Sequence, residues 1–311
     1  MSTEQHALEP KSEAEMLLGQ RALGERTYRE IGEDISSFMN QAQKVQEFWD
    51  RRPCNIMHSP KILGTREYFD EVEARRYMVE PHIPLFAEFD RWRGKKVLEV
   101  GCGIGTDSIR FAHAGAELTA VDLSPRSLEI ARQRFEIHGL KANLYCGSAE
   151  HLTSLVPVER FDLIYSFGVI HHTHHPEKVL AELKNYCGPA TELRIMLYSK
   201  WSWKVFWIIA KYGKGAFWRA DELVQTYSEA QTGCPVTFYY SRRNVRRLMK
   251  DFDVLRISKN YIFSYKISKY TKYEYEREWY FQWMPKLLFD WLQRHLGWHL
   301  LIVAKPKAFR Y

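Results

Sequence analysis

The sequence contains no long apolar run and no paired cysteines. Its longest apolar stretches, such as VFWIIA, fall far short of the roughly 20 apolar residues that a membrane-spanning helix needs. The opening MSTEQHALEP has neither the basic nor the apolar part of a secretion signal. The five cysteines are scattered and form no CxxC pair, which argues against a disulfide framework and against a cysteine-type zinc site. We therefore expect a cytoplasmic protein without a transmembrane segment.

Charge and aromatic residues are unevenly distributed along the chain. The 311 residues are 45% hydrophobic and 27% charged, which is typical of a globular protein, and their net charge is +7. Between Ser199 and Trp298 we count 18 Lys and Arg against 9 Asp and Glu, a balance of +9, so the other 211 residues sum to −2. The same stretch holds 25 of the 45 aromatic residues. The chain thus has a nearly neutral first two-thirds and then a basic, aromatic region.

Strand-like and helix-like segments alternate from Lys95 onward. Five strands are predicted in succession, at KKVLEV, AELTAVD, ANLYCG, FDLIYSF and ELRIMLYS. Helical segments separate them, and one has Ser124 as its predicted N-cap with Pro125 at its first position. This βαβ spacing predicts an α/β fold, in which a parallel sheet carries helices on both faces. Two last strands are predicted at FDVLRISKNYIF and WHLLIVAKP.

The first 92 residues have a different pattern. Residues 1 to about 50 predict a polar helix, RRPCNIMHSPKILG predicts a loop, and EYFDEVEARRYMVEPHIPLFAEF predicts one more helical segment. We therefore expect a helical extension or cap over residues 1–92. Residues 93–306 should form the α/β domain, with insertions at about 199–250 and 263–297.

A glycine-rich turn directly follows the first predicted strand. Gly101, Gly103 and Gly105 can adopt positive φ and let a ligand approach the backbone closely. The dinucleotide fingerprint G-x-G-x-x-G/A does not fit, because Thr106 occupies its third glycine position. Glu99 precedes Gly101 by two residues, and its carboxylate would repel a pyrophosphate. An acid at this place suits a ligand with an ammonium group and no phosphate, such as S-adenosylmethionine.

Here the sequence resembles the class I S-adenosylmethionine-dependent methyltransferases, in particular the small-molecule branch with the ubiquinone and menaquinone methyltransferases. The resemblance covers roughly residues 93–200 and resumes in the last two strands; it rests on LEVGCGIG, VDLSP and FDLIYSFGVIHH. It implies a Rossmann-like, doubly wound, seven-stranded sheet whose last strand is antiparallel. It also implies S-adenosylmethionine as the cofactor.

The resemblance further implies the cofactor-binding residues. Asp122 stands where the family's acid holds the ribose hydroxyls, whereas Ser148 stands where the family often has an Asp near the adenine. The residues carried over in this way are Glu99, Gly101, Cys102, Gly103, Gly105, Asp122, Leu123, Ser148, Ala149, Glu150 and Ser166. VQEFWDRRPCN is similar to a segment that precedes the cofactor domain in some bacterial members. Phe48, Trp49 and Tyr68 therefore either fold over the cofactor or belong to a structural helix docked on the sheet.

Four histidines follow the fourth strand within five positions. His171 and His172 match a histidine pair that the resembling enzymes have near the transferred methyl group, at the sheet edge where open α/β folds bind ligands. Histidine titrates near neutral pH, so one of the two either acts as a general base or packs and orients. Adjacent histidines rarely converge on one ion, and we assign no metal site. We expect His174 and His175 to be solvated.

The two insertions allow more than one interpretation. They either form a roof over a large apolar or aromatic acceptor, or pack on each other as a satellite core. SRRNVRRLMKDF predicts a helix capped by Ser241. Its arginines are either a solvated face or a contact for an anionic substrate, a phospholipid surface or RNA. These are Arg242, Arg243, Arg246 and Arg247.

The sequence favours methyl transfer to an oxygen or nitrogen of a small or lipophilic acceptor, and the basic region would match an anionic one. Peripheral membrane contact is compatible with this hypothesis. One alternative is a tRNA-modifying methyltransferase, which the basic region would serve and which predicts salt-dependent tRNA binding. Another is a non-catalytic protein that retains the cofactor fold. The intact Glu99, Gly101, Gly103 and Asp122 argue against that alternative.

Overall fold

The computed structural model describes residues 42–228, 234–270, 272 and 274–307. The chain divides into two compact units, and the second, Val45–Tyr311, holds the sheet. Of the first unit only residues 42–44 are described, and they are helical. The polar helix predicted for residues 1 to about 50 therefore lies outside the described residues as far as residue 41.

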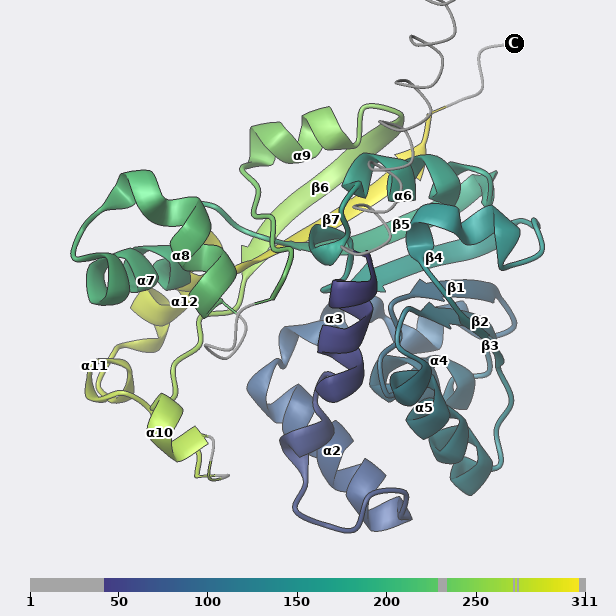
Figure 1. Ribbon diagram of the computed structural model, residues 1–311, viewed down its shortest axis with the longest axis horizontal. Helices are drawn as coiled ribbons and strands as arrows, with labels where there is room; N and C mark the ends of the chain where they lie inside the picture. Colours follow the sequence, from purple (N-terminus) through teal and green to yellow (C-terminus); the bar gives the residue numbers. More distant parts are fainter. Residues whose placement is uncertain (1–41, 229–233, 271, 273, 308–311) are drawn as a thin grey trace, which may run out of the picture. The chain divides into compact units, whose positions relative to one another are not determined.

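A seven-stranded sheet forms the centre of the second unit (Figure 1). Its order is β3-β2-β1-β4-β5-β7-β6. The first five strands are parallel, and β7 is antiparallel to both of its neighbours, β5 and β6. This confirms the predicted doubly wound sheet with an antiparallel last strand. The strands are β1 (Lys96–Val100), β2 (Glu117–Asp122), β3 (Asn143–Cys146), β4 (Phe161–Phe167), β5 (Cys187–Tyr198), β6 (Phe252–Asn260) and β7 (His299–Pro306).

The helices that cross between parallel strands begin and end as their sequences predict. In α5 (Pro125–His138) the Ser124 side chain accepts a hydrogen bond from the Ser127 amide at 3.0 Å, Pro125 opens the first turn, and Gly139 ends the helix at φ 66°. The other helices of this region are α4 (Thr106–His113), η3 (Ala149–Ser154), η4 (Ile170–His172) and α6 (Pro176–Lys184).

The segment before the sheet differs from its prediction as one helix. Pro81 lacks a backbone N–H to continue the ladder, so α2 (Arg66–Val79) ends at Glu80 and α3 (His82–Ala87) starts anew. Short turns η1 (Ile56–His58) and η2 (Phe89–Trp92) flank them. The insertions contain α7 (Trp203–Gly213), η5 (Phe217–Arg219), α8 (Ala220–Tyr227), α9 (Arg242–Leu248), α10 (Ile267–Tyr270), α11 (Trp279–Gln282) and α12 (Lys286–Leu296).

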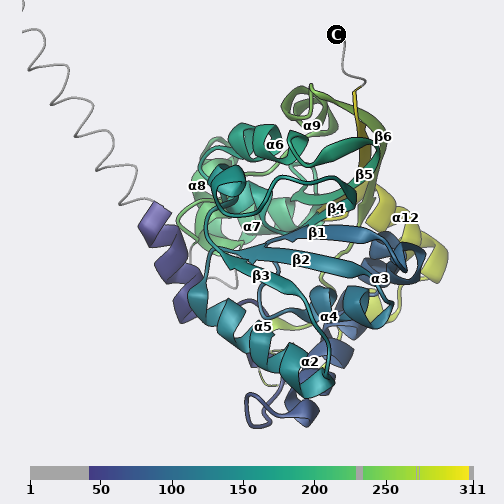
Figure 2. The same cartoon turned by 90° about the vertical axis from the view of Figure 1, so that its right-hand side faces the viewer.

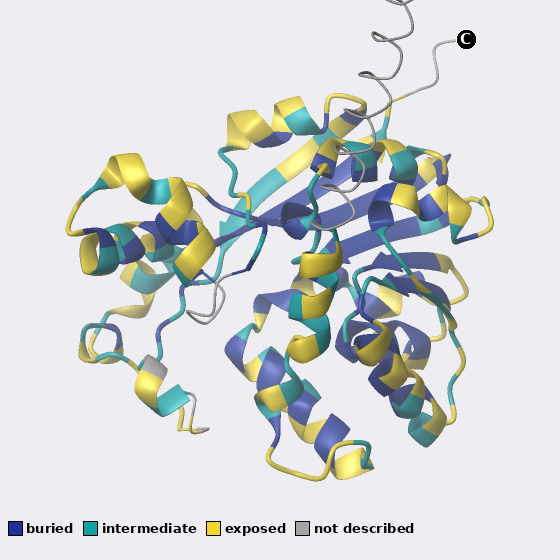
Figure 3. Ribbon diagram, viewed as in Figure 1, coloured by how far each residue is buried: buried dark blue, intermediate teal, exposed yellow. Residues whose placement is uncertain are grey.

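Successive residues of β4 face two different cores. Leu163 and Tyr165 pack with side chains of α3, η2, α4 and α5, whereas Ile164 packs with side chains of α6 and α9 on the other face. Figure 2 shows α4 and α5 on one side of the sheet and α6 and α9 on the other. The central strands are buried, while β6 at the edge is half-exposed (Figure 3). Burial on both faces explains the nearly continuous apolar runs of β1, β4 and β5.

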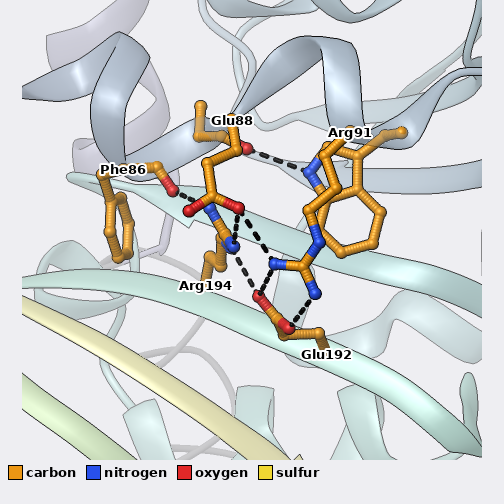
Figure 4. A network of polar contacts seen from close by, with 7 residues as sticks. Phe86, Glu88, Arg91, Glu192 and Arg194 are labelled. Carbon is orange, nitrogen blue, oxygen red and sulfur yellow. Dashed lines mark hydrogen bonds and ion pairs between the residues drawn. The ribbon is translucent and has the colours of Figure 1, made fainter.

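A charged network ties the segment before the sheet to β5 (Figure 4). The buried Arg194 donates from Nε to Glu192 and from Nη2 to Glu88, both at 2.6 Å. Its Nη1 donates to the carbonyl oxygen of Phe86. Arg91 pairs with both carboxylates at 2.9 Å. Since Glu88 follows α3 and Arg91 lies in η2, the network fixes these elements on the sheet.

Candidate active site

A cleft lies at the carboxyl edge of the parallel strands. Its empty volume is about 1000 Å³, open solvent at its mouth included. The last residues of β1, β2 and β4 line it, as do the turn after β1 and part of residues 45–55. Parallel α/β sheets bind their ligands at this edge, so the cleft lies where the sequence predicts the site.

The glycine turn leaves room on the cleft side. A Cβ on Gly101 would lie 2.0 Å from a methyl carbon of Val169, so no other residue fits there. At Gly103, with φ 54°, a Cβ would meet nothing within 4 Å. The amide of Gly103 donates to Oδ2 of Asp122 at 2.7 Å. The first glycine is therefore required by packing, and the second leaves open space beside the backbone.

Asp122 stands at the end of β2 and lines the cleft. Its Oδ2 accepts from the Gly103 amide, and its Oδ1 accepts from the Ser124 amide at 2.9 Å. These two bonds fix the carboxylate, and each oxygen keeps a second acceptor position. Such a carboxylate can accept hydrogen bonds from two neighbouring hydroxyls of a ligand.

Glu99 lies at the floor of the cleft and is buried. The hydroxyl of Ser108 donates to its Oε2 at 2.5 Å. Burial, assisted by the nearby charge of Asp107, raises the pKa of Glu99 to about 8. A cationic ligand group beside it would favour the ionised carboxylate.

Asp107 is a further acid that lines the cleft, and the sequence did not single it out. Arg76 donates to both of its oxygens at 3.1 Å, from Nε and from Nη2. The hydroxyls of Tyr77 and Tyr165 donate to it at 3.0 and 2.9 Å. Asp107 is the second residue of the helix that follows the glycine turn, and this position is the only feature of the sequence that could have pointed to it. Arg76 also lines the cleft, and no motif marks it.

His172 and His171 are both buried but differ in what they face. His172 lines the cleft, and its Nδ1 lies 2.8 Å from the carbonyl oxygen of Val236. A carbonyl only accepts, so Nδ1 carries the proton and Nε2 carries the lone pair. His171 is fully buried, and its ring lies 3.7 Å from that of Tyr198. Burial holds the pKa of His171 well below its usual range.

The other two histidines of the run belong to the loop backbone. Oε1 of Glu150 accepts from the amides of His174 and His175, at 2.9 and 3.2 Å. The side chain of His175 is exposed, as expected, whereas His174 is half-buried. Glu150 therefore fixes the histidine loop.

The cofactor-binding positions implied by the resemblance fall into two groups. Glu99, Gly101, Cys102, Gly103, Asp122, Leu123, Ser148 and Ala149 line the cleft. Three others lie behind its described lining. Gly105 packs on α5 near Ala131, Glu150 holds the histidine loop, and the Ser166 hydroxyl donates to the Val100 carbonyl at 3.0 Å. These three support the walls.

The segment before α2 contributes side chains that the sequence did not identify. Val45, Cys54 and Asn55 line the cleft. Trp49 lines it too, and its ring lies 5.3 Å from that of His172. In contrast, Tyr68 is buried beside Phe69, and its hydroxyl donates to the Ile56 carbonyl at 2.7 Å. Trp49 thus covers the cleft, whereas Tyr68 stabilises the fold of its own segment.

The insertions pack on each other, and the segment from Cys234 to Phe238 contacts the histidine loop. The Trp203 ring on α7 lies 6.3 Å from those of Tyr280 and Phe281 on α11. The amide of Phe238 donates to the His171 carbonyl at 2.8 Å. Val236, which binds His172, belongs to the same segment. In the part of the chain that the structure describes, the tryptophans of the insertions do not line the cleft.

Known proteins match the central part of the chain. A family profile described as "Methyltransferase domain" matches residues 97–190. A tRNA U34 carboxymethyltransferase of Hydrogenovibrio crunogenus is 31% identical over 167 residues, which are 52% of this chain and 47% of that protein. A ubiquinone biosynthesis O-methyltransferase of Azoarcus sp. is 37% identical over 87 residues, 28% of this chain and 37% of that protein. The chain thus spans less than half the length of these relatives.

The fold also matches a solved structure. Magnesium protoporphyrin IX methyltransferase from Synechocystis PCC 6803, solved with bound SAH (S-adenosylhomocysteine), superposes with a TM-score of 0.51 at 13% identity. The match covers 84% of this chain and 97% of that one, and at this identity it concerns the fold alone. The matched profile identifies residues 97–190 as a methyltransferase domain, and the sheet order around it is that of the class I, S-adenosylmethionine-dependent fold.

Proposed function

We propose that this protein transfers the methyl group of S-adenosylmethionine to an oxygen or nitrogen of a small or lipophilic acceptor. The observation that carries the proposal is the convergence of Glu99, Asp122 and His172 on one cleft at the carboxyl edge of the sheet. Glu99 suits the ammonium group of the cofactor and Asp122 suits its ribose hydroxyls, while His172 lines the same cleft and carries a lone pair at Nε2.

The residues of the cleft fit this cofactor. Asp122 has acceptor positions for the ribose hydroxyls, and Glu99 is an acid for the ammonium group of the methionine end. The open side of Gly103 allows a ligand to lie against the backbone. Leu123, Ser148 and Ala149 line the part of the cleft assigned to the adenine.

When bound, the sulfonium of the cofactor supplies an activated methyl group, so the protein mainly has to position the acceptor. We assign His172 as the base that accepts the acceptor's proton at Nε2. The Val236 carbonyl holds its ring and its tautomer, and Trp49 covers it. His171, sealed against Tyr198, supports the ring of His172, which lies 4.3 Å away.

Calorimetry with S-adenosylhomocysteine and NADH tests the cofactor assignment. S-Adenosylhomocysteine should bind and NADH should not, since Thr106 stands where the dinucleotide fingerprint requires its third glycine. Asp122→Ala removes the acceptors for the ribose and should weaken binding by roughly 10- to 100-fold, the worth of hydrogen bonds to a charged group. Binding of NADH in place of S-adenosylhomocysteine would exclude the proposed function.

Modification of tRNA is a second candidate. It is favoured by the name of the Hydrogenovibrio crunogenus relative and by α9, whose four arginines are exposed. Arg243 and Arg247 lie four residues apart on this helix. If tRNA is the acceptor, its affinity should fall steeply with salt, and Arg243→Glu with Arg247→Glu should reduce it further.

A lipophilic acceptor is favoured by the surface of the insertions. Trp279, Trp283, Leu287 and Trp291 are all at least half-exposed, and α12 has no buried residue. Exposed tryptophans beside Lys and Arg are typical of proteins that dock on anionic bilayers. The described helices are all too short or too polar to cross a bilayer. We propose that the insertions contact a membrane surface peripherally.

A further inference from the structure

Two histidines and a glutamate meet beside the cleft, outside the motifs of the family. Nε2 of His82 and Nδ1 of His299 lie 2.9 Å apart. Oε1 of Glu80 lies 3.8 Å from Nε2 of His299, which is the ring nitrogen that does not face His82. Both histidines are buried, and one potential ligand atom from each of the three residues lies within 4.8 Å of the others.

This spacing fits three ligands of one ion. Imidazole nitrogens bind zinc at about 2.0–2.1 Å, so two of them on a tetrahedral ion lie about 3.3 Å apart, and the observed 2.9 Å would have to widen by a few tenths of an ångström on binding. Two histidines and one carboxylate form a common site for divalent transition metals, and such a set leaves positions open for water or a ligand oxygen. The carboxylate of Glu80 is half-buried and can approach the ion by a side-chain rotation.

The surroundings keep both histidines neutral, as metal binding requires. Burial lowers the pKa of His82 to about 3, and burial with neighbouring cations holds that of His299 well below its usual range. Of these cations, Arg76 is paired with Asp107, and Lys204 lies over the Trp298 ring. The remaining walls are aromatic: Phe167, Tyr198 and Tyr261.

The cluster belongs to the same sheet edge as the cleft. His299 begins β7 opposite Tyr198, the last residue of β5. The His82 ring lies 6.0 Å from that of Phe167, which lines the cleft. Glu80 and His82 flank Pro81, which forms the turn between α2 and α3.

We propose that Glu80, His82 and His299 bind one divalent first-row transition metal ion. This departs from the sequence-based expectation that the protein has no metal site. A further role, in which an open position of the ion holds an oxygen of the acceptor, rests on the proposed methyl transfer. The binding of the metal does not.

The test uses the full chain, stripped with EDTA and titrated with Zn²⁺ and Co²⁺. Calorimetry should show one zinc per chain, cobalt should give visible absorption bands of a low-coordinate site, and zinc should raise the melting temperature because it binds the folded state. Glu80→Gln, at a half-buried position, should keep the fold and weaken binding at least about 10-fold. His299→Ala should abolish it, with melting to check its fold.

The chain provides a matched control. Nε2 of His113 and Nδ1 of His138 lie 3.2 Å apart, and Asp70 lies 3.9 Å from His138, but that carboxylate is mostly exposed. His113→Ala should leave zinc binding unchanged. If His113→Ala removes the zinc and Glu80→Gln does not, the proposal is wrong.

If the unaltered chain binds neither zinc nor cobalt, the proposal is also wrong. The contact between His82 and His299 is then only a hydrogen bond that joins α3 to β7. S-Adenosylhomocysteine binding is measured on the same samples. Zinc binding without S-adenosylhomocysteine binding would contradict the proposed function and support the metal site, so the two failures are distinguishable.

Discussion

We expect Glu99 to couple cofactor binding to the release of a proton. With a pKa of about 8, its carboxyl is mostly protonated in the free protein at pH 7. An ammonium group beside it favours the ionised form, so binding S-adenosylhomocysteine should release about one proton. The affinity should therefore rise as the pH rises from about 6 to about 8. Calorimetry in phosphate and in Tris, which differ in ionisation enthalpy, should give different apparent enthalpies.

The variant Glu99→Gln serves as the control for this proton release. It keeps an acceptor for the Ser108 hydroxyl but has no titrating group. Its apparent enthalpy should be the same in both buffers. Equal enthalpies for the unaltered protein would show that Glu99 does not change its protonation on binding.

A substitution of His172 can distinguish its role as a base from its role in packing. In His172→Asn the amide N–H can replace Nδ1–H as donor to the Val236 carbonyl, but the basic nitrogen is lost. Turnover should fall by about 10²- to 10⁴-fold, the usual worth of a general base, while S-adenosylhomocysteine affinity changes little. Transfer of labelled methyl groups from S-adenosylmethionine to a cell extract measures it.

The neighbouring histidine should respond differently. His171→Ala removes a fully buried ring from beside Tyr198, so it should lower the melting temperature more than the turnover of the folded fraction. Full activity in the double variant His171→Ala/His172→Ala would leave both histidines with a packing role only.

The residues of the cleft divide by whether local sequence determines their position. Glu99 could be predicted from the residues, because it stands just before the glycine turn at the end of a strand that the apolar pattern identifies, whereas Asp122 was implied by the family resemblance. The Arg76–Asp107 pair could not, because it joins residues 31 positions apart through the docking of α2. The sequence also left His171 and His172 equivalent. The structure distinguishes them, because His172 lines the cleft and contacts Val236, whereas His171 is fully buried against Tyr198.

At the scale of elements, the charged network between α3, η2 and β5 should stabilise the fold unequally. Glu192 and Arg194 are both buried, so Glu192→Ala leaves a buried guanidinium with one partner fewer. We expect it to lower the free energy of unfolding by about 3 kcal/mol. Glu88 is 40% exposed, and Glu88→Ala should cost only about 1 kcal/mol. Urea denaturation measures both.

If Glu192→Ala and Glu88→Ala lower the free energy of unfolding equally, this prediction is wrong. The comparison is matched, because each substitution removes one carboxylate that pairs with both Arg91 and Arg194. The two carboxylates differ mainly in burial. The difference between the two losses of unfolding free energy therefore measures how much burial strengthens an ion pair in this network.

Helices and strands, like the residues of the cleft, could be predicted where the local sequence determines them. The strands β1, β2, β4 and β5 are largely buried and carry apolar runs. The crossover helices have start signals of their own, which are the glycine turn before α4, Ser124 and Pro125 at α5, and Pro176 at α6, so these elements could be located from the sequence. The break at Pro81 was missed because the apolar spacing continues across it. The insertions could be delimited by composition, but the contact of Trp203 with α11 depends on packing between segments far apart in the chain.

At the scale of the whole molecule, the basic charge and the exposed tryptophans occur in the same insertions. Trp283 is 85% exposed and Leu287 is 83% exposed, four residues apart, with Lys286 exposed between them. Trp283 lies in the turn before α12, and Leu287 lies in the first turn of α12. Exposed apolar side chains at such a site can insert into a bilayer interface while neighbouring cations meet anionic lipid. We therefore expect the protein to sediment with vesicles containing phosphatidylserine, and less so as salt rises.

Substitutions on this face should remove vesicle binding without unfolding the protein. Trp283→Glu with Leu287→Glu adds two charges at positions that pack against little, so melting should be unchanged while sedimentation with the vesicles is lost. Leu85→Glu is the matched control, because Leu85 is 78% exposed but lies on α3, outside the insertions. If all three proteins sediment alike, the exposed tryptophans do not bind membranes. All three proteins should bind S-adenosylhomocysteine equally, since none of the substituted residues lines the cleft. A lipophilic acceptor presented in the same vesicles should be methylated more slowly by the double variant, but not by Leu85→Glu.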